Sequence, residues 1–465
     1  MLTRYLAPSD YGVAALVTVL AALLAGLFSL GTGASIGVRY FEAAEGAPRA
    51  RVIWTSAALL LVNSAVLAAA GFLLAPQLSR LLLGSADAAY LVRLSLAALA
   101  VSTVTTPFLV FLQLEERAKT FVALTTVSSV VTILIGVAAV VQLGRGISGL
   151  FEAGLIGAVV LLAVTLAAVS PRLGFGLDFG QIGPLVRIGF PGIFGLGAFF
   201  FIDWSDRVLL ERLAGLDEVG VYSIGYSFGM VMSLAVTAFG SAWPPYFIAF
   251  INRRDEAVAL FGRVLKYYVF LFGTLTLVFF LAARPVVLLM TAPAYHGAFT
   301  VVGFVALSYT LKGAYLIMLP ALVYEKKLYL QTGIEWAAAA VNLALNFLLI
   351  PLLRKDGAAV ATLVAYACLP ALTCFVSARY LPVRHDWKAI GKFAAGFAAV
   401  VALSLAPFGG GPLSGLAIAI MSLILFGFYV LYVPLSSGER GALFALISSA
   451  KDKFRRPSGG SPANG

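Results

Sequence analysis

Charged residues are scarce in this chain of 465 residues. Asp, Glu, Lys and Arg make up 11% of it, while 61% of its residues are hydrophobic. A soluble globular domain carries charge on about a quarter of its residues, so this composition excludes one. Apolar runs of roughly 20 residues recur from end to end, and each is long enough to cross a bilayer as a helix. Barrel strands would instead alternate over about ten residues. The sequence therefore predicts an all-α polytopic membrane protein.

Cysteine and histidine are nearly absent as well. Cys368 and Cys374 fall inside one predicted span, and His296 and His385 fall in predicted loops. This distribution indicates neither a disulfide framework nor a metal site. The sequence also lacks the Gly-rich loop, followed by Lys and Ser or Thr, that marks a nucleotide site. We therefore expect no cofactor, and ATP-driven transport is disfavoured.

The apolar runs predict thirteen membrane spans. They lie at about 12–36, 52–75, 89–113, 120–141, 149–170, 185–206, 219–243, 267–291, 299–323, 330–351, 357–378, 389–407 and 414–434. Between two of them, the segment 244–266 has apolar and basic residues at helical spacing. That pattern predicts an amphipathic helix lying in the membrane interface.

The basic residues are unevenly distributed along the chain, whose formal net charge is +11. Most Lys and Arg lie in alternate loops, on the side that also holds the C-terminus. Because Lys and Arg collect on the cytoplasmic side of membrane proteins, we expect a cytoplasmic C-terminus. The positive charge then reflects topology, and no nucleic-acid partner is expected.

One pattern of spans occurs twice. Residues 4–14 (RYLAPSDYGVA) resemble residues 212–222 (RLAGLDEVGVY), so that Arg4 matches Arg212 and Gly12 matches Gly220 at a shift of 208 residues. At nearly the same shift the following pairs also match: Pro76 with Pro285, Glu116–Arg117 with Glu325–Lys326, and Gly149 with Gly357. Duplicated helix bundles are the usual construction of secondary transporters.

The first copy has no span before its motif, whereas the second motif follows the span 185–206. We therefore expect a further helix before this sequence, giving fourteen spans; a genuine thirteen-span protein is the alternative. With six spans each, the copies are parallel and related by a two-fold axis along the membrane normal. The predicted parts are an N-terminal lobe, a C-terminal lobe, two additional helices and a cytoplasmic tail, at 1–182, 183–382, 383–434 and 435–465.

Ionisable residues inside spans are costly and mark candidate functional sites. Lys312 is the strongest candidate, because it lies about 13 residues, or roughly 20 Å of helix, into the span 299–323. Ser308, Tyr309 and Tyr315 share its helical face. A lysine between tyrosines suits phosphate attraction and sugar stacking. The alternatives are a buried lysine paired with one acid, or a side chain that extends to the interface.

Asp203, Asp206 and Arg207 close the span 185–206. Asp203 and Arg207 are spaced i, i+4, which favours a local ion pair. The alternative is that Asp203 couples transport to a proton or cation. Direct pairing of Asp203 with Lys312 is not expected, because their predicted depths differ by about 12–15 Å.

Two polar stripes follow helical spacing. The first comprises Ser29, Thr32, Ser35 and Arg39; the second comprises Gln331, Glu335, Asn342 and Asn346. Such stripes either line a wet cavity or join helices through hydrogen bonds, and the sequence favours neither. In the first case Arg39, Asn342 and Asn346 would contact substrate, and Glu335 would join Asp203 as a coupling group.

Three motifs carry a family resemblance: RYLAPSDYG at the N-terminus, DRVLLERLAGLDEVGVYSIGYS at 206–227, and NLALNFLLIPLLRKDGAAVATLVAY at 342–366. They resemble polysaccharide-export flippases of the O-antigen or capsule type, whose superfamily also contains multidrug and toxin extruders and peptidoglycan-precursor flippases. The resemblance covers essentially the whole chain. It implies two six-helix lobes around a central cavity, often with two additional helices.

The resemblance also implies a function. The expected activity is translocation of an undecaprenyl-pyrophosphate-linked oligosaccharide across a bacterial inner membrane by alternating access, with a polysaccharide polymerase and other export components as partners. A multidrug cation antiporter is the alternative, but the first lobe has no acid at mid-depth and Lys312 would repel cations. A membrane enzyme would need a large outer loop or paired carboxylates, so enzymatic activity is not expected.

Overall fold

The computed structural model describes residues 2–405 and 412–441, and every regular element there is a helix. The α-helices are α1 Pro8–Ser29, α2 Thr32–Glu42, α3 Ala47–Leu83, α4 Ala89–Leu114, α5 Ala118–Val141, α6 Gly146–Val169, α7 Ile182–Ala214, α8 Leu216–Gly229, α9 Met232–Ile248, α10 Arg254–Met290, α11 Phe299–Met318, α12 Pro320–Tyr324, α13 Leu328–Ser377, α14 Trp387–Leu405 and α15 Pro412–Tyr432. The predicted all-α fold is confirmed.

Within these described ranges, nine helical stretches are long and apolar enough to cross a membrane, or up to eleven if each bent pair forms one span. The 50-residue α13 contains two helices, because Arg354 interrupts it with a left-handed φ of 52°. The chain is therefore a multi-pass membrane protein. The totals of thirteen and fourteen spans remain predictions, and the end of the predicted span 389–407 lies outside the described residues.

The two copies of the repeat have matching helices. α3 and α10 are each 37 residues long and begin at residues 47 and 254, a shift of 207. α4 spans 89–114, and α11 with α12 spans 299–324, a shift of 210 at both ends. The turns that follow contain Glu116 and Lys326, both with a φ of 55°. This turn pairs Glu116 with Lys326 and not with Glu325, so the sequence alignment was one residue off there.

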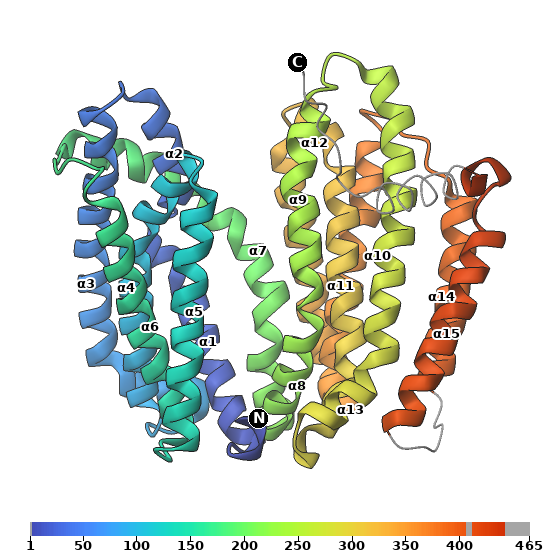
Figure 1. Cartoon of the computed structure of the whole chain (residues 1–465), viewed down its shortest axis with the longest axis horizontal. Coiled ribbons are helices and arrows are strands. Elements are labelled where there is room, and N and C mark those ends of the chain that lie inside the picture. Colours follow the sequence, from blue (N-terminus) through green and yellow to red (C-terminus); the bar gives the residue numbers. More distant parts are fainter. Residues whose placement is uncertain (1, 406–411, 442–465) are drawn as a thin grey trace, which may run out of the picture.

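Figure 1 shows α1–α6 gathered on one side and α8–α13 on the other, with α7 running between the two groups. α14 and α15 pack against α10 at the outer flank. α7, with the short 3-10 helix Phe179–Gln181 before it, connects the two groups, and its parts 179–193 and 197–214 are bent by 51° relative to each other. Pro191 lies in the turn before this bend, where its missing backbone donor weakens the helix. The exact lobe boundaries remain predictions.

The lobes touch through a reciprocal pair of glycines in α1 and α8. A Cβ added to Gly12 would collide with the carbonyl of Leu216, and one added to Gly220 would collide with the carbonyl of Pro8. Residues 216 and 220 lie 208 positions after residues 8 and 12, so each copy offers the same surface to the other. Such a self-complementary contact requires a two-fold axis between the helices. The predicted two-fold relation of the copies is confirmed.

Further contacts close the lobes at the same end of the molecule. The Tyr295 hydroxyl donates to the Leu6 carbonyl at 2.8 Å, and its ring meets Tyr11 edge-on at 5.5 Å. Arg212 donates to the Leu81 carbonyl. These contacts hold the two lobes together at the end that the charge distribution predicts to be extracytoplasmic.

The predicted interfacial helix at 244–266 is wrong. α9 continues to Ile248, and Arg254 already begins α10, which runs on as one helix to Met290. Phe261 and Leu265 are each 1% exposed and pack in the core of the second lobe. The apolar residues of this segment lie on one helical face because that face packs against protein. The spacing of apolar residues alone does not show whether such a face packs against protein or against lipid.

Candidate substrate cavity

A cavity of about 310 Å³ lies where the two lobes meet. α1 supplies Tyr11, Ala14, Ala15 and Thr18 to its wall, and the other side chains come from α7, α8 and α11 and from Met230 just after α8. The polar and aromatic groups from this second set are Asp203, Trp204, Arg207, Ser223, Tyr226, Ser227 and Tyr309. The wall therefore combines a carboxylate, a guanidinium, hydroxyls and aromatic faces, which together can hold a polar headgroup.

The carboxylate of Asp203 links several helices of the second lobe. Its Oδ1 accepts hydrogen bonds from the hydroxyls of Tyr366, at 2.6 Å, and Tyr226, at 3.1 Å. The Tyr226 hydroxyl also lies 3.2 Å from that of Tyr309. Side chains from α7, α8, α11 and α13 thus meet around one carboxylate.

The ion pair that spacing favours between Asp203 and Arg207 is not formed. Arg207 instead pairs with the adjacent Asp206 at 3.0 Å and donates to the backbone carbonyl of Asp203 at 2.5 Å. Asp206 is fully buried and also accepts from the Tyr222 hydroxyl. Because Arg207 is satisfied by these groups, the Asp203 carboxylate is left to the tyrosines.

Lys312 lies beyond this tyrosine layer, among aromatic rings. Its Nζ is 4.5 Å from the ring centre of Phe199, 5.7 Å from Tyr366 and 5.8 Å from Tyr309. No carboxylate in the described part of the chain lies within 4.0 Å of it. The alternative of a lysine paired with one acid is therefore not observed there. Lys312 and Asp203 do not pair directly, as expected, but Tyr366 contacts both.

The other predicted neighbours of Lys312 are engaged elsewhere. The Tyr315 hydroxyl donates to Glu335 at 2.6 Å, and Ser308 donates to the Phe304 carbonyl of its own helix at 2.9 Å. Each is 1% exposed. Three side chains were expected on the same helical face as Lys312. Of these, Tyr309 lies next to Lys312 in the structure.

The second polar stripe is buried between helices. Gln331 donates to Glu335 at 3.1 Å, and the Asn346 amide donates to Asn342 at 3.0 Å. Both asparagines are fully buried. Both bonds lie within α13, while Glu335 also joins α13 to α11 by accepting from Tyr315. Substrate contact by Asn342 and Asn346 and coupling by Glu335 remain predictions.

The first polar stripe is divided by the break between α1 and α2. Thr32 and Ser35 are fully buried, and Arg39 donates to Gln181 at 2.8 Å and pairs with Glu42 at 2.5 Å. Gln181 lies just before α7. Arg39 therefore anchors the segment that enters α7, and its predicted contact with substrate is untested.

Sequence analysis missed much of the aromatic wall. Tyr11, Tyr226 and Tyr366 lie within the three motifs, so the motifs contain a signal for them. Phe199 and Trp204 have none, because their convergence depends on how the helices pack. No group of three or more His, Cys, Asp or Glu able to hold a metal occurs within 2–405 and 412–441.

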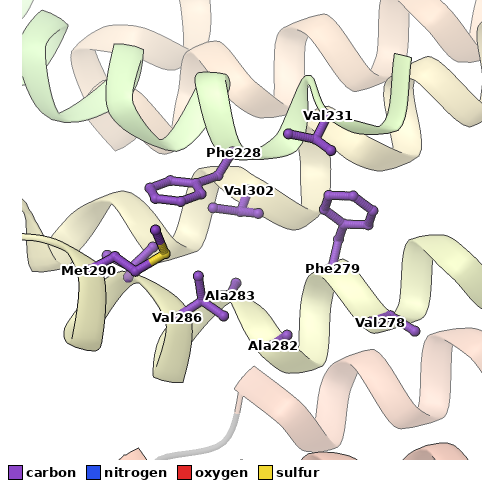
Figure 2. A pocket seen from close by; sticks show the side chains of 10 residues that line it. Phe228, Val231, Val278, Phe279, Ala282, Ala283, Val286, Met290 and Val302 are labelled. Carbon is purple, nitrogen blue, oxygen red and sulfur yellow. The ribbon is translucent and has the colours of Figure 1, made fainter. Parts of the chain in front are cut away.

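A second cavity, of about 300 Å³, differs sharply in chemistry. Figure 2 shows it between α8, α10 and α11, with Phe228, Phe279 and Met290 among the side chains that face it. Every residue in its wall is apolar. It offers nothing to hold a charged headgroup but suits a hydrocarbon chain.

Residues 1–250, more than half of the chain, match the family described as polysaccharide biosynthesis protein. The chain belongs to this family. The resemblance found in the motifs is thereby confirmed. No curated protein matches the sequence.

Solved structures show where the fold belongs. The chain is similar to the lipid II flippase MurJ in an inward-closed conformation, with a TM-score of 0.68, 14% identity, and coverage of 90% of this chain and 92% of that one. It is also similar to an inward-facing multidrug resistance transporter of the MATE family, with a TM-score of 0.67, 14% identity, and coverage of 82% and 92%. At these identities the likeness establishes the fold.

Proposed function

We propose that this protein is a flippase that moves an undecaprenyl-pyrophosphate-linked oligosaccharide across the bacterial inner membrane. The observation that carries the proposal is Lys312, a cation inside the membrane with aromatic rings around it and no carboxylate within 4.0 Å in the described residues. An unpaired intramembrane charge is costly and is retained where it has a ligand. A pyrophosphate supplies the missing anion, and sugars pack well on aromatic faces.

The wall of the inter-lobe cavity supports the same substrate. Tyr226, Tyr309 and the serines in this wall provide hydroxyl partners for a glycan. The lipid tail needs no polar contact, and the apolar cavity of Figure 2 offers it a surface within the same lobe. Headgroup and tail would thus be held by separate parts of the second lobe.

Alternating access follows from the way the lobes meet. The glycine contact and Tyr295 hold the lobes together at the predicted extracytoplasmic end, so the observed state receives substrate from the cytoplasmic side. Separation of α1 from α8 would then open the cavity outward. Asp203, held by two tyrosines, and Glu335 are our candidates for coupling this motion to an ion. The C-terminus is cytoplasmic in this proposal, and a polysaccharide polymerase and other export components are its partners.

A cation antiporter of the multidrug type is the second candidate. The likeness to the MATE family transporter and the carboxylate of Asp203 in the cavity wall favour it. Against it stands Lys312, which lies next to Tyr309 without a paired carboxylate in the described residues, since it repels organic cations by Coulomb repulsion.

Native mass spectrometry of the detergent-purified protein tests the proposal. We expect a bound polyprenyl-pyrophosphate glycan, whose mass also identifies the sugars, and its loss in the Lys312→Ala variant but not in the Lys312→Arg variant. Retention of bulk phospholipid alone, together with binding of added cationic dyes, would favour the antiporter.

A further inference from the structure

A third cavity, of about 730 Å³, lies within the first lobe at the end opposite the glycine contact. Its wall is formed by the end of α2 and the loop after it, the first turn of α3, the end of α4 and residues 172–176 of the linker between α6 and α7. Three arginines, Arg49, Arg51 and Arg172, line it. None of these residues belongs to the inter-lobe cavity.

The acids in this cavity do not neutralise its arginines. Glu115 accepts a hydrogen bond from Tyr40 at 2.6 Å, and Glu45 reaches only Arg49, at 3.4 Å. Within the described residues, no carboxylate lies within 4.0 Å of Arg51 or Arg172. The Nε of Arg49 is buried and has no hydrogen-bond partner. Three guanidinium groups therefore line one cavity, and not all of their N–H donors are taken up by acceptors of the protein.

The start of α3 adds to the positive potential. Its first turn contains no acidic residue, and its N-cap, Gly46, has no side chain that could accept from the first amides. Ala47 and Ala50 of that turn line the cavity. The Ala50 amide donates to the Gly46 carbonyl and Pro48 has no N–H, so the amides of Ala47 and Arg49, together with the helix dipole, favour an anion at this position.

The linker that forms one wall is held firmly. Trp54 donates to the Leu173 carbonyl at 3.2 Å, and the Asp178 amide donates to Thr55 at 2.8 Å. The Trp54 ring also meets Phe175 at 5.2 Å. The arginines are thus presented by a built site that ties α3 to the segment leading into α7.

The rim of the cavity is aromatic and exposed. Phe175, in the wall, is 77% exposed, and Phe41 nearby is 62% exposed. Phe side chains next to basic residues are typical of surfaces that lie in the membrane interface, and basic pockets on the cytoplasmic side bind anionic lipid headgroups. A soluble anion would use the arginines but leave these rings in water.

We propose that this cavity binds the phosphate group of an anionic phospholipid from the surrounding leaflet. The guanidinium groups and the first turn of α3 hold the phosphate, and the acyl chains lie along Phe175 and Phe41. The bound lipid fastens the linker 170–181 to α3 and α4, and so stabilises the first lobe at the point where the chain passes into α7. The proposal does not depend on which substrate the protein transports.

The test compares lipid binding by the wild type and by the Arg51→Gln/Arg172→Gln variant, using native mass spectrometry and thermal unfolding in detergent. The matched control is Arg263→Gln/Arg384→Gln, which removes two exposed arginines from the predicted cytoplasmic side of the second lobe. We expect phosphatidylglycerol to bind the wild type and the control with the same affinity. Its affinity for the cavity variant should be lower by a factor of about ten or more. Phosphatidylcholine and inorganic phosphate are the two comparison ligands.

Equal binding of phosphatidylglycerol by the cavity variant would overturn the proposal. Equal thermal protection by inorganic phosphate would show that the site takes a soluble anion and would overturn the lipid assignment. Both double variants should unfold at the wild-type temperature without added lipid. If the cavity variant does not, the single Arg172→Gln variant, which alters only an exposed linker side chain, gives the same comparison.

Discussion

The two copies of the repeat have the same backbone but different chemistry. α4 and α11 begin at residues 89 and 299, so a shift of 210 places Lys312 on Ser102 and Tyr309 on Leu99. The same backbone position thus carries a cation beside a tyrosine in one lobe, and a serine beside a leucine in the other. At these two matched positions, the cation and the aromatic ring are present in the second copy and not in the first.

The two tyrosines that donate to Asp203 also match non-aromatic residues in the first copy. At a shift of 208, Tyr226 corresponds to Thr18 and Tyr366 corresponds to Ala158. Thr18 and Tyr226 both line the inter-lobe cavity, so the two-fold axis passes close to it. The cavity is symmetric in its backbone and asymmetric in its chemistry, which suits a substrate with a charged headgroup at one end.

The largest expected effect concerns the buried pair of Asp206 and Arg207, which belongs to the second lobe. Asp206→Leu leaves Arg207 buried without its carboxylate, and we expect the free energy of unfolding to fall by about 3–5 kcal/mol. Denaturant unfolding in detergent measures it. The Asp206→Leu/Arg207→Leu double variant should lose clearly less, because no lone charge remains. Equal losses in the single and double variants would show that the pair is not coupled.

The glycine contact is the place where the two lobes should behave alike. Gly12→Ala and Gly220→Ala each place a Cβ against a carbonyl of the other lobe, and each should cost about 1–3 kcal/mol by overpacking or drive the lobes apart. Double electron–electron resonance between spin labels on the two lobes distinguishes these results. Gly154→Ala in α6 is the control, because its Cβ meets nothing within 4 Å. Different effects of the two contact variants would contradict the two-fold relation.

The smallest expected effect lies at the flank of the second lobe. Lys266 pairs with Glu439 at 2.6 Å and with Asp386 at 3.0 Å, and a shift of 207 places it on Leu59 of α3. The hydrogen bond from Lys266 lowers the pKa of Asp386. Burial opposes ionisation of Glu439, but hydrogen bonds from Lys266 and Ser436 lower its pKa to about 2.

Folding lowers the pKa of both carboxyl groups. Their contribution to the free energy of unfolding is therefore complete above the unfolded pKa of about 4. It is lost as the pH falls through the folded value. These groups are partly exposed, so we expect less than about 1 kcal/mol. Hydrogen exchange of α14 should accelerate as the pH falls from 5 to about 2, after correction for intrinsic rates. Lys266→Leu, which copies α3, should exchange faster at pH 7 and respond less to acid; an unchanged response would remove the pairs from this account.

Much of this could be predicted from the sequence, because it depends on local pattern. Apolar run lengths gave the helical membrane fold, the motif at 4–14 and 212–222 gave the repeat, and depth within a span singled out Lys312. The partner of Arg207 could not be predicted, since Asp203 and Asp206 are both within its reach. Nor could the aromatic wall, which four helices assemble. The pattern at 244–266 misled because an amphipathic face can meet either protein or lipid.

The most direct test is translocation of the co-purifying glycolipid in proteoliposomes that contain the wild type, Lys312→Ala, Lys312→Arg or the exchange variant Lys312→Ser/Ser102→Lys. Accessibility of the glycan to an added glycosidase reports how much reaches the other leaflet. We expect Lys312→Ala to fold normally and lose most activity, Lys312→Arg to retain much of it, and the exchange variant to stay inactive because Ser102 lacks the aromatic partners. Full activity of Lys312→Ala would contradict the central claim that this cation holds the headgroup.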